Sequence, residues 1–468
     1  MDNVKLTRRT VKMRDFSQLP LNPHPVFPQW STWDVYPHQY YGSMRKYVIE
    51  REYLMPSLEN DFLRVEVNAD IGGRVWRVHD KAADRDMCNF NSEVHTYNAG
   101  FGLNYTSGGI ECNYPLAHSP TTSRQRELST AEHEDGSASI IISEYERIWR
   151  TRWSVTYTLF PDRSCLQMRV RIYNRSRHDS RYMYWGNCGF VLNDDTQYLF
   201  PDYGAAMHGE EHRIFSWPMW QHRDLSYYRE VPPEMLGLYM LDTRDPWFGY
   251  WDHGQSFGLA HYADLTDLPG RKHWTWGTHA RQAAVRAQTH HSSGEVFGEI
   301  QSGRVVIQEH KDLMPPETEH EWTELWFPVR DTGAFNSAGP GGAMRTELLE
   351  AGAHRLGRHQ QLAVGVLAGD AREHVEEVGH IAGDGPIGGE QAEVRVDARR
   401  ARVVVARADV GVASQPARLA PDHQRALRMR LEPEQAVGHV RAGALEGTSP
   451  DDVGALVEAG LDLDQDDH

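Results

Sequence analysis

Apolar and polar residues alternate along most of the first 330 positions of this 468-residue chain. Such alternation, with β-branched and aromatic residues and with breaks rich in turn-forming residues, is typical of antiparallel β-sheet. It covers residues 62–69, 74–80, 137–148, 153–160, 165–174, 182–192, 247–251, 256–263, 295–303, 304–310 and 319–329. Helical periodicity is nearly absent there. We therefore predict an all-β protein, built as an antiparallel sandwich or barrel rather than from βαβ units.

Two regions depart from this pattern. Residues 1–44 are rich in proline and aromatic residues, which predicts an extended N-terminal arm, because proline blocks helix interiors and central strands. Residues 336–468 contain no aromatic residue, although the chain has 14 Trp, 20 Tyr and 14 Phe. We expect this tail to be disordered, or to be GC-rich coding sequence translated in a shifted frame; an alanine-rich helical tail is the alternative. Residues 45–335 are the predicted β domain.

Composition narrows the class of protein. The formal net charge of -17 argues against nucleic acid or an anionic membrane as partner. No run of 18 apolar residues and no secretory signal is present, so we expect a soluble, cytoplasmic protein. The four cysteines lack CxxC pairing and zinc-ligand spacing. Phosphate-binding loops, dinucleotide fingerprints and GxSxG elbows are also missing, so we predict no cofactor and no metal.

Residues 100–122 are the stretch richest in candidate chemistry. A glycine pair, Gly108-Gly109, brings the backbone close to a second group. Four polar or aromatic candidates follow within ten residues: Glu111, Asn113, Tyr114 and His118. Polar groups gathered on such a turn suit a polar ligand. A solvated β-turn, with His118 as a capping residue, is the alternative.

Further candidates lie in the second half of the chain. The insertion at 215–235 holds Trp217 and Trp220, which favours a packed loop over a site rather than a disordered one. His253 and His261 are eight residues apart, a spacing that puts both on one face of a regular strand. Zinc would need a third ligand that the sequence does not identify.

Four more positions are candidates for ligand binding. Lys272, beside Trp274 and Trp276, is typical of a pocket wall, with one tryptophan expected in the core. Arg74 follows a glycine turn and suits a ligand hydroxyl or carboxylate, or alternatively a salt bridge at a strand edge.

Five motifs in order along the chain carry a resemblance to a known family: 58–81, 107–122, 217–228, 272–277 and 299–304. Over about 300 residues the chain resembles an uncharacterised bacterial family with a galactose-mutarotase-like β-supersandwich, whose members often carry C-terminal tetratricopeptide repeats. The resemblance implies that the concave sheet face holds a sugar. The repeats expected after the sandwich are missing from this sequence, which fits the suspected frame shift.

The resemblance also implies roles for single residues. Epimerases of this superfamily take the proton of the anomeric hydroxyl with a Glu in a Glu-x-Gln pattern, which Glu299 and Gln301 match. Their histidine acid lies in an Asn-His pair, where this chain has Asn187 followed by Cys188. The missing histidine argues against simple mutarotation and directs the search for an acid to the stretch between Glu111 and His118.

We therefore expect a carbohydrate-active protein whose ligand is a sugar or a glycoside. Glu111 and Glu299 are predicted as a catalytic carboxylate pair of the glycosidase or epimerase type, assisted by His118 or His261. One of the two carboxyls would have to stay protonated near pH 7. The alternatives are a carbohydrate-binding module without catalysis and a protein-interaction scaffold. The oligomeric state is left open.

Overall fold

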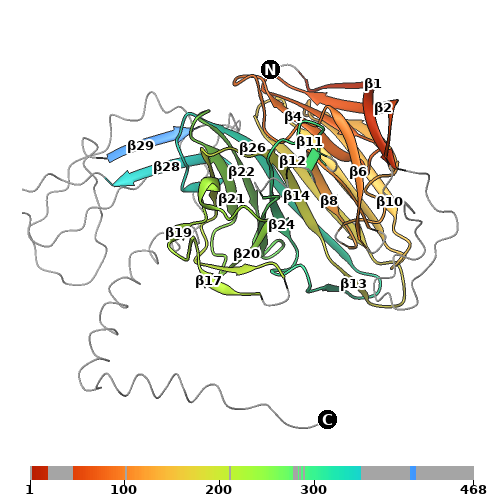
Figure 1. The fold of residues 1–468 in the computed structure, drawn as a ribbon. Coiled ribbons are helices and arrows are strands. Elements are labelled where there is room, and N and C mark those ends of the chain that lie inside the picture. The colour runs from red at the N-terminus through yellow and green to blue at the C-terminus, as the bar shows by residue number, and fades with distance from the viewer. Residues whose placement is uncertain are drawn as a thin grey trace, which may run out of the picture. The chain divides into compact units, whose positions relative to one another are not determined.

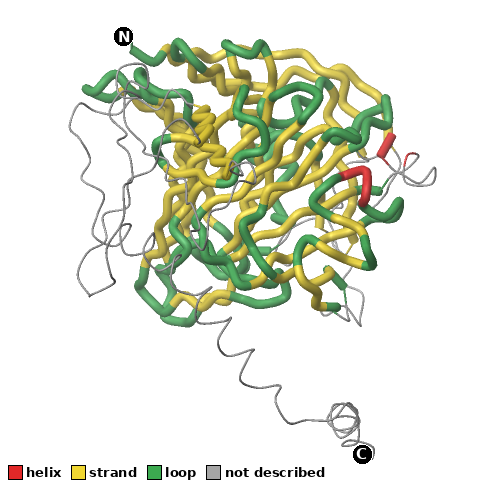
Figure 2. Tube along the Cα trace, turned by 90° about the vertical axis from the view of Figure 1, so that its left-hand side faces the viewer, coloured by secondary structure: helices red, strands yellow, loops and turns green. Residues whose placement is uncertain are grey.

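The fold is known from a computed structural model that describes residues 3–18, 46–100, 103–116, 118–209, 212–277, 283, 286–287, 290–348 and 401–406. Strands make up nearly all of its regular structure (Figure 1; Figure 2). The predicted all-β, antiparallel class is thus confirmed. Period-two segments become strands because one face of each can be buried while the other carries polar side chains.

The larger sheet has 14 strands and holds the site described below. All of its pairings are antiparallel except that of β1 with β6. In order they are β17 (Ile214–Ser216), β16 (Gly204–Met207), β20 (Leu236–Leu241), β23 (Gly270–Thr275), β24 (Phe297–Gly303), β14 (Trp185–Val191), β8 (Ile110–Asn113), β4 (Arg74–Asp80), β3 (Leu63–Asn68), β2 (Lys46–Glu59), β1 (Lys5–Gln18), β6 (Glu93–Gly100) and β7 (Leu103–Thr106), with β5 (Arg85–Asp86) paired to β4.

The second sheet has eight strands. In order they are β15 (Thr196–Leu199), β21 (Trp247–Asp252), β22 (Phe257–Ala263), β26 (Glu319–Arg330), β12 (Leu166–Tyr173), β11 (Arg152–Leu159), β10 (Ala138–Tyr145) and β9 (Glu127–Glu132). Smaller elements complete the description: β13 (Ser180–Tyr182) with β25 (Asp312–Met314), β18 (Met219–Trp220) with β19 (Arg223–Asp224), the 3-10 helix η1 (Tyr228–Glu230), and β27 (Ser337–Gly339), β28 (Gly342–Leu348) and β29 (Ala401–Ala406).

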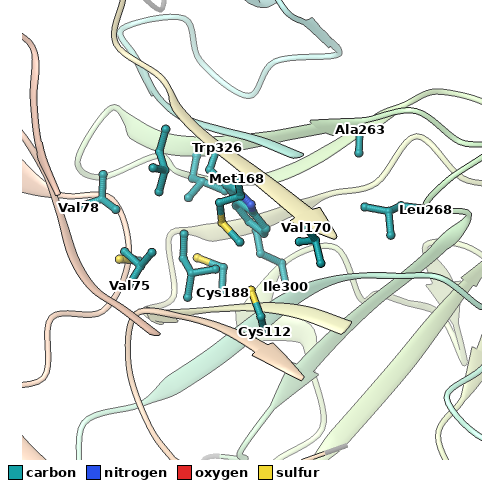
Figure 3. Close-up of a cluster of buried hydrophobic side chains, with 14 of the residues drawn as sticks. Val75, Val78, Cys112, Met168, Val170, Cys188, Ala263, Leu268, Ile300 and Trp326 are labelled. Atoms are coloured by element: carbon teal, nitrogen blue, oxygen red, sulfur yellow. The ribbon is translucent and has the colours of Figure 1, made fainter. Parts of the chain in front are cut away.

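The two sheets pack face to face over one large apolar core. Cys188 and Ile300 enter it from the larger sheet, and Met168 and Trp326 enter it from the smaller one (Figure 3). All four are fully buried. Because side chains alternate along a strand, their sequence neighbours on the larger sheet point to its other face. That alternation decides which candidate residues can share a site.

Three expectations about the chain's course change. Residues 5–18, part of the predicted arm, form a strand paired along its whole length with β2; residues 19–45 lie outside the described residues. Residues 304–310 are a loop and not a strand, since Arg304 turns away to pair with Asp312. The strands continue past the predicted boundary at 335 to Leu348. Residues 349–400 and 407–468 lie outside the described part of the chain.

Candidate functional site

A row of polar side chains crosses the face of the larger sheet that points away from the core. Strand register places its five members directly opposite one another: Glu111 on β8, Asn187 on β14, Gln301 on β24, Lys272 on β23 and Tyr239 on β20. Each is buried. The sheet therefore brings together residues that are far apart in sequence, as the predicted site requires.

Glu299 lies beside this row on β24 and accepts four hydrogen bonds. The Tyr105 hydroxyl and the Trp276 indole N–H donate to Oε1, at 2.8 and 3.1 Å. The side-chain amides of Asn187 and Gln301 donate to Oε2, at 2.8 and 2.9 Å. A carboxylate has about four acceptor positions, so these donors fill them. The carboxylate is therefore held in one orientation.

Glu111 is the second carboxylate on this face. Thr122 donates a hydrogen bond to its Oε1, and Asn113 donates to its Oε2 at 3.3 Å. Arg74 and His118 lie 4.0 and 3.7 Å from Oε2. Burial raises the pKa of Glu111, but Arg74, His118 and Thr122 outweigh it and lower that pKa to about 2. Glu111 is thus ionised at neutral pH.

Tyr105 connects the two carboxylates. Its hydroxyl donates to Glu299, and its ring stacks edge-on against His118, with centroids 4.9 Å apart. His118 in turn faces Glu111. Strand β14 separates the strands of the two glutamates, so their Cα atoms are roughly 12 Å apart by strand spacing and rise. We call Tyr105, Glu111, His118, Asn187 and Glu299 the central cluster.

Gly109 explains why the glycine pair precedes β8. Its φ is +66°, and a Cβ there would lie 1.8 Å from the carbonyl oxygen of Val75. Only glycine allows this backbone to pass so close to β4. The stretch predicted as a polar turn is therefore a glycine turn that leads into a short buried strand, Ile110–Asn113.

Lys272 extends the site away from Glu111. Its Nζ donates to Gln308 at 2.7 Å and lies 5.1 Å above the ring of Trp274. Burial lowers the pKa of Lys272 to about 8, against the opposing effect of Glu299 and Glu309. An amine with such a pKa is both a hydrogen-bond donor and a group able to exchange a proton near neutrality.

Four buried polar atoms in the site have no hydrogen-bond partner among the described residues. They are Nε of Arg74, Nδ1 of His118, Oδ1 of Asn187 and Nε1 of Trp274. Asn187 is 4% exposed, and its amide nitrogen already binds Glu299. An unpaired buried acceptor costs about 1–3 kcal/mol unless a ligand or water satisfies it. These atoms are the natural contacts for a ligand hydroxyl.

Three predicted ligand-binding aromatics lie elsewhere. Tyr114 is buried in the core against Trp153, because the chain leaves β8 at Asn113 and the alternation ends. Trp217 also packs in the core and donates to the carbonyl of Phe200 at 3.2 Å. Trp220 packs on Phe215 beside that core. None of the hydrogen bonds and ion pairs of Glu111 and Glu299 among the described residues comes from the 215–235 segment.

The two predicted histidines do not share a face. A turn after Asp252 interrupts the assumed strand, so β21 ends there and β22 begins at Phe257. His253 is exposed on that turn and contacts Gln197. His261 is buried between the sheets, 3.0 Å from Glu324. Neither histidine lies in the central cluster, and His261 is therefore not the assisting acid.

The inference drawn from the missing histidine at position 188 was wrong. Cys188 points into the core with no exposed surface, while Asn187 points to the polar face. A histidine at 188 would point away from Glu299 as well, so its absence carries no information about the site. Cys112, the residue after Glu111, is also buried, and burial raises the pKa of its thiol to about 12, so the thiol stays protonated at neutral pH.

Several contributors were not predicted as site residues: Tyr105, Thr122, Tyr239 and Gln308. Tyr105 and Thr122 belong to the stretch 100–122 already singled out, but no local pattern shows that they reach Glu299 and Glu111. The others lie on elements whose pairing no local pattern reveals. Within the described residues, no group of three potential ligands could hold a metal ion. No described helix is long and apolar enough to cross a membrane.

The architecture defines the chain as a two-sheet antiparallel β-sandwich protein. A TPR-domain protein from Parabacteroides distasonis has a similar structure, with a TM-score of 0.63 and 24% identity over 70% of this chain and 55% of that one. Galactose mutarotase-like proteins from Clostridium acetobutylicum (TM-score 0.43, 8% identity, 60% and 96% covered) and Lactobacillus casei (0.38, 10%, 58% and 99%) are more distantly similar. This chain thus spans about half of the TPR-domain protein.

Residues 31–329 match the model of a family described as a domain of unknown function, DUF5107. The match covers more than half of the 468 residues. The chain belongs to this family, and the resemblance inferred from the five motifs is confirmed.

The pKa of Glu111 predicts a specific loss of stability in acid. A depressed carboxyl pKa stabilises the fold above the unfolded value of 4.5, and this stability is lost as the pH falls toward about 2. Between pH 6 and pH 3 the loss is about 2 kcal/mol. Urea unfolding at both pH values should therefore show a fall in unfolding free energy that is smaller by about 2 kcal/mol in Glu111→Gln than in wild type. Equal falls in both proteins would contradict the assignment.

Proposed function

We propose that the polar face of the larger sheet binds a carbohydrate and that the protein acts on it by acid/base catalysis. The face offers carboxylates, amides and an imidazole to hydroxyl groups, with Trp274 and Trp276 beside them. Sites of this kind combine aromatic surfaces with a few placed polar groups. The observation that carries the proposal is that Tyr105 contacts both Glu299 and His118.

Glu299 is the proposed base. All of its acceptor positions are filled, so a ligand hydroxyl must replace one of the four donors to reach it. The amide of Asn187 is suited to this exchange, since its oxygen has no partner and can accept from the same ligand. The proton of the ligand hydroxyl then passes to the Glu299 carboxylate. The negative charge that forms on the ligand oxygen lies next to hydrogen-bond donors whose positions are already fixed.

His118 is the proposed acid. Its side chain is 26% exposed, so a ligand can reach it, and Glu111 lies 3.7 Å from its Nδ1. Glu111, with a pKa of about 2, cannot donate a proton at neutral pH. Its role in the proposal is to hold the imidazole of His118 in one orientation. A glutamate base and a histidine acid favour epimerase-type proton transfer over glycoside hydrolysis by two carboxyls.

A carbohydrate-binding domain without catalysis is the second candidate. The same four hydrogen bonds to Glu299 favour this function. They hold the carboxylate in a fixed position on the binding surface, but they also occupy the oxygens that a catalytic base needs. A third candidate, an interaction scaffold, would leave the polar row without a sugar ligand.

An assay of wild type and His118→Asn distinguishes these functions. Free hexoses and oligosaccharides are followed by proton NMR for anomeric exchange and for cleavage. We expect turnover by wild type and a kcat lower by about 100-fold in His118→Asn, because an acid contributes roughly 10²- to 10⁴-fold. The exposed His133→Asn is the control and should match wild type. Sugar binding without turnover would favour the binding domain, and neither binding nor turnover would reject a carbohydrate function.

A further inference from the structure

A second group of polar side chains lies on the same face, beyond Lys272. His208 and His212 place their Nε2 atoms 3.9 and 4.0 Å from the two carboxylate oxygens of Glu309. The Tyr239 hydroxyl donates to Glu309 at 3.2 Å. We call His208, His212, Tyr239 and Glu309 the outer cluster. The side chains of its histidines and glutamate are 30%, 31% and 47% exposed, whereas Glu111 and Glu299 are buried.

The sheet explains why these residues meet. His208 follows β16, whose partner β20 carries Tyr239, and Gly237 on β20 lies opposite Trp274. A Cβ at Gly237 would come within 2.4 Å of Trp274 and 3.0 Å of the Cβ of His208. Glu309 comes from the loop 304–310, which packs Val305 and Ile307 on the apolar cluster around Trp185 and Tyr239. The loop and the sheet together therefore build the outer cluster.

The outer cluster is continuous with the central cluster. Trp274 stands edge-on to both His208 and Trp276, with ring centroids 5.2 and 5.9 Å apart. Lys272 lies over the rings of Trp274 and Tyr239. Strands β23 and β20 separate β24, which carries Glu299, from β16, so the two clusters are roughly 14 Å apart at strand spacing. Aromatic and polar groups fill the interval.

The outer cluster suits a neutral, hydroxyl-bearing group. The distances of 3.9 and 4.0 Å between the Nε2 atoms and the Glu309 carboxylate oxygens are too long for hydrogen bonds. Neither imidazole is therefore hydrogen-bonded to this carboxylate. Burial, Lys272 and His212 lower the pKa of His208 to about 4, although Glu309 opposes them, so His208 is neutral at pH 7. A neutral imidazole and a carboxylate can bind one hydroxyl together, because the imidazole N–H donates to the hydroxyl oxygen and the carboxylate accepts the hydroxyl hydrogen.

We propose that the outer cluster is a second sugar subsite, so that the ligand is an oligosaccharide or glycoside with one ring at Glu299 and a ring further along the same chain at His208, His212 and Glu309. The inference rests on the proposed carbohydrate function and names its substrate class. A ligand that reaches both clusters makes contacts that a free monosaccharide cannot make.

Titration calorimetry with matched sugars tests this subsite. The probes are glucose with maltotriose, maltotetraose, cellotriose and cellotetraose, and galactose with galactotriose. Wild type should bind at least one of these oligosaccharides about tenfold more tightly than its monosaccharide, since each lost ligand hydrogen bond is worth roughly three- to tenfold. Glu309→Gln and His212→Ala should remove this gain and leave monosaccharide affinity unchanged. The exposed His253→Ala is the matched control and should keep the gain.

The possible failures are separate. If monosaccharides bind, but the longer oligosaccharides bind no more tightly or the outer variants keep the full gain, the subsite is rejected and the proposed function stands. If no sugar of the panel binds wild type, both the proposed function and the subsite are rejected. Circular dichroism of each variant shows that the fold is retained.

Discussion

Replacing Glu324 by alanine is expected to lower the free energy of unfolding by about 4 kcal/mol. Glu324 lies on β26 with no exposed surface and accepts hydrogen bonds from four side chains: Tyr184 at 2.6 Å, Ser302 at 2.6 Å, His261 at 3.0 Å and Trp322 at 3.3 Å. Removing one partner of a buried charged network costs about 3–5 kcal/mol, because the remaining polar groups stay buried and unpaired. Urea unfolding measures the loss.

The network also reaches the candidate site, because Ser302 follows Gln301 on β24. The matched control is Glu321→Ala, on the same strand, whose 33% exposed carboxylate pairs with Arg169 at 2.6 Å. A surface ion pair is worth about 0–1 kcal/mol, so this variant should stay within that range of wild type. Equal losses of unfolding free energy in the two variants would show that the buried hydrogen bonds of Glu324 contribute no more than a surface ion pair.

Replacing Glu299 by glutamine is expected to lower kcat by about 1,000-fold, which corresponds to about 4 kcal/mol of barrier. The amide has nearly the same shape but cannot take up the proton of a ligand hydroxyl. The fold should survive, because the amides of Asn187 and Gln301 can turn and present their oxygens to the new NH₂ group. Sugar affinity should change by less than tenfold.

The comparison variant is Glu295→Gln, an exposed carboxylate two residues before β24. It should keep the wild-type kcat and sugar affinity. A Glu299→Gln protein with normal turnover would remove Glu299 as the base. A Glu299→Gln protein that fails to fold would show that Glu299 has a structural role. The Glu299→Asp variant, which retains a carboxylate, would then distinguish this structural role from a role in catalysis.

Most strands could be predicted from sequence because each buries one face and exposes the other. The alternation at 165–174 became β12, which runs from Leu166 to Tyr173 with every second side chain buried. The prediction of a strand at residues 304–310 was wrong for a physical reason. Their apolar residues suit a strand, but Val305 and Ile307 are buried by packing over Trp185 and Tyr239 instead. Tertiary contacts override β-propensity in such short segments.

The site was harder to predict because it depends on which face each residue occupies. Glu299 and Gln301 shared a face by their spacing, and β14 and β24 then aligned Asn187 with Gln301. Tyr114 and Trp217 looked equally suitable, but each stands where a strand has ended, before Pro115 and Pro218, so spacing could not predict its direction. His208 and Glu309 are brought together by long-range pairing that no local pattern shows.

The central claim is that carbohydrate binds on the polar face of β8, β14, β24 and β23. A crystal structure of the protein with the tightest-binding sugar of the calorimetry panel tests it most directly. We predict sugar hydroxyls within about 2.7–3.0 Å of Oδ1 of Asn187 and of the Glu299 carboxylate, with a ring near Trp274. Sugar bound on any other surface, with the hydrogen bonds of Glu299 unchanged, would contradict the account.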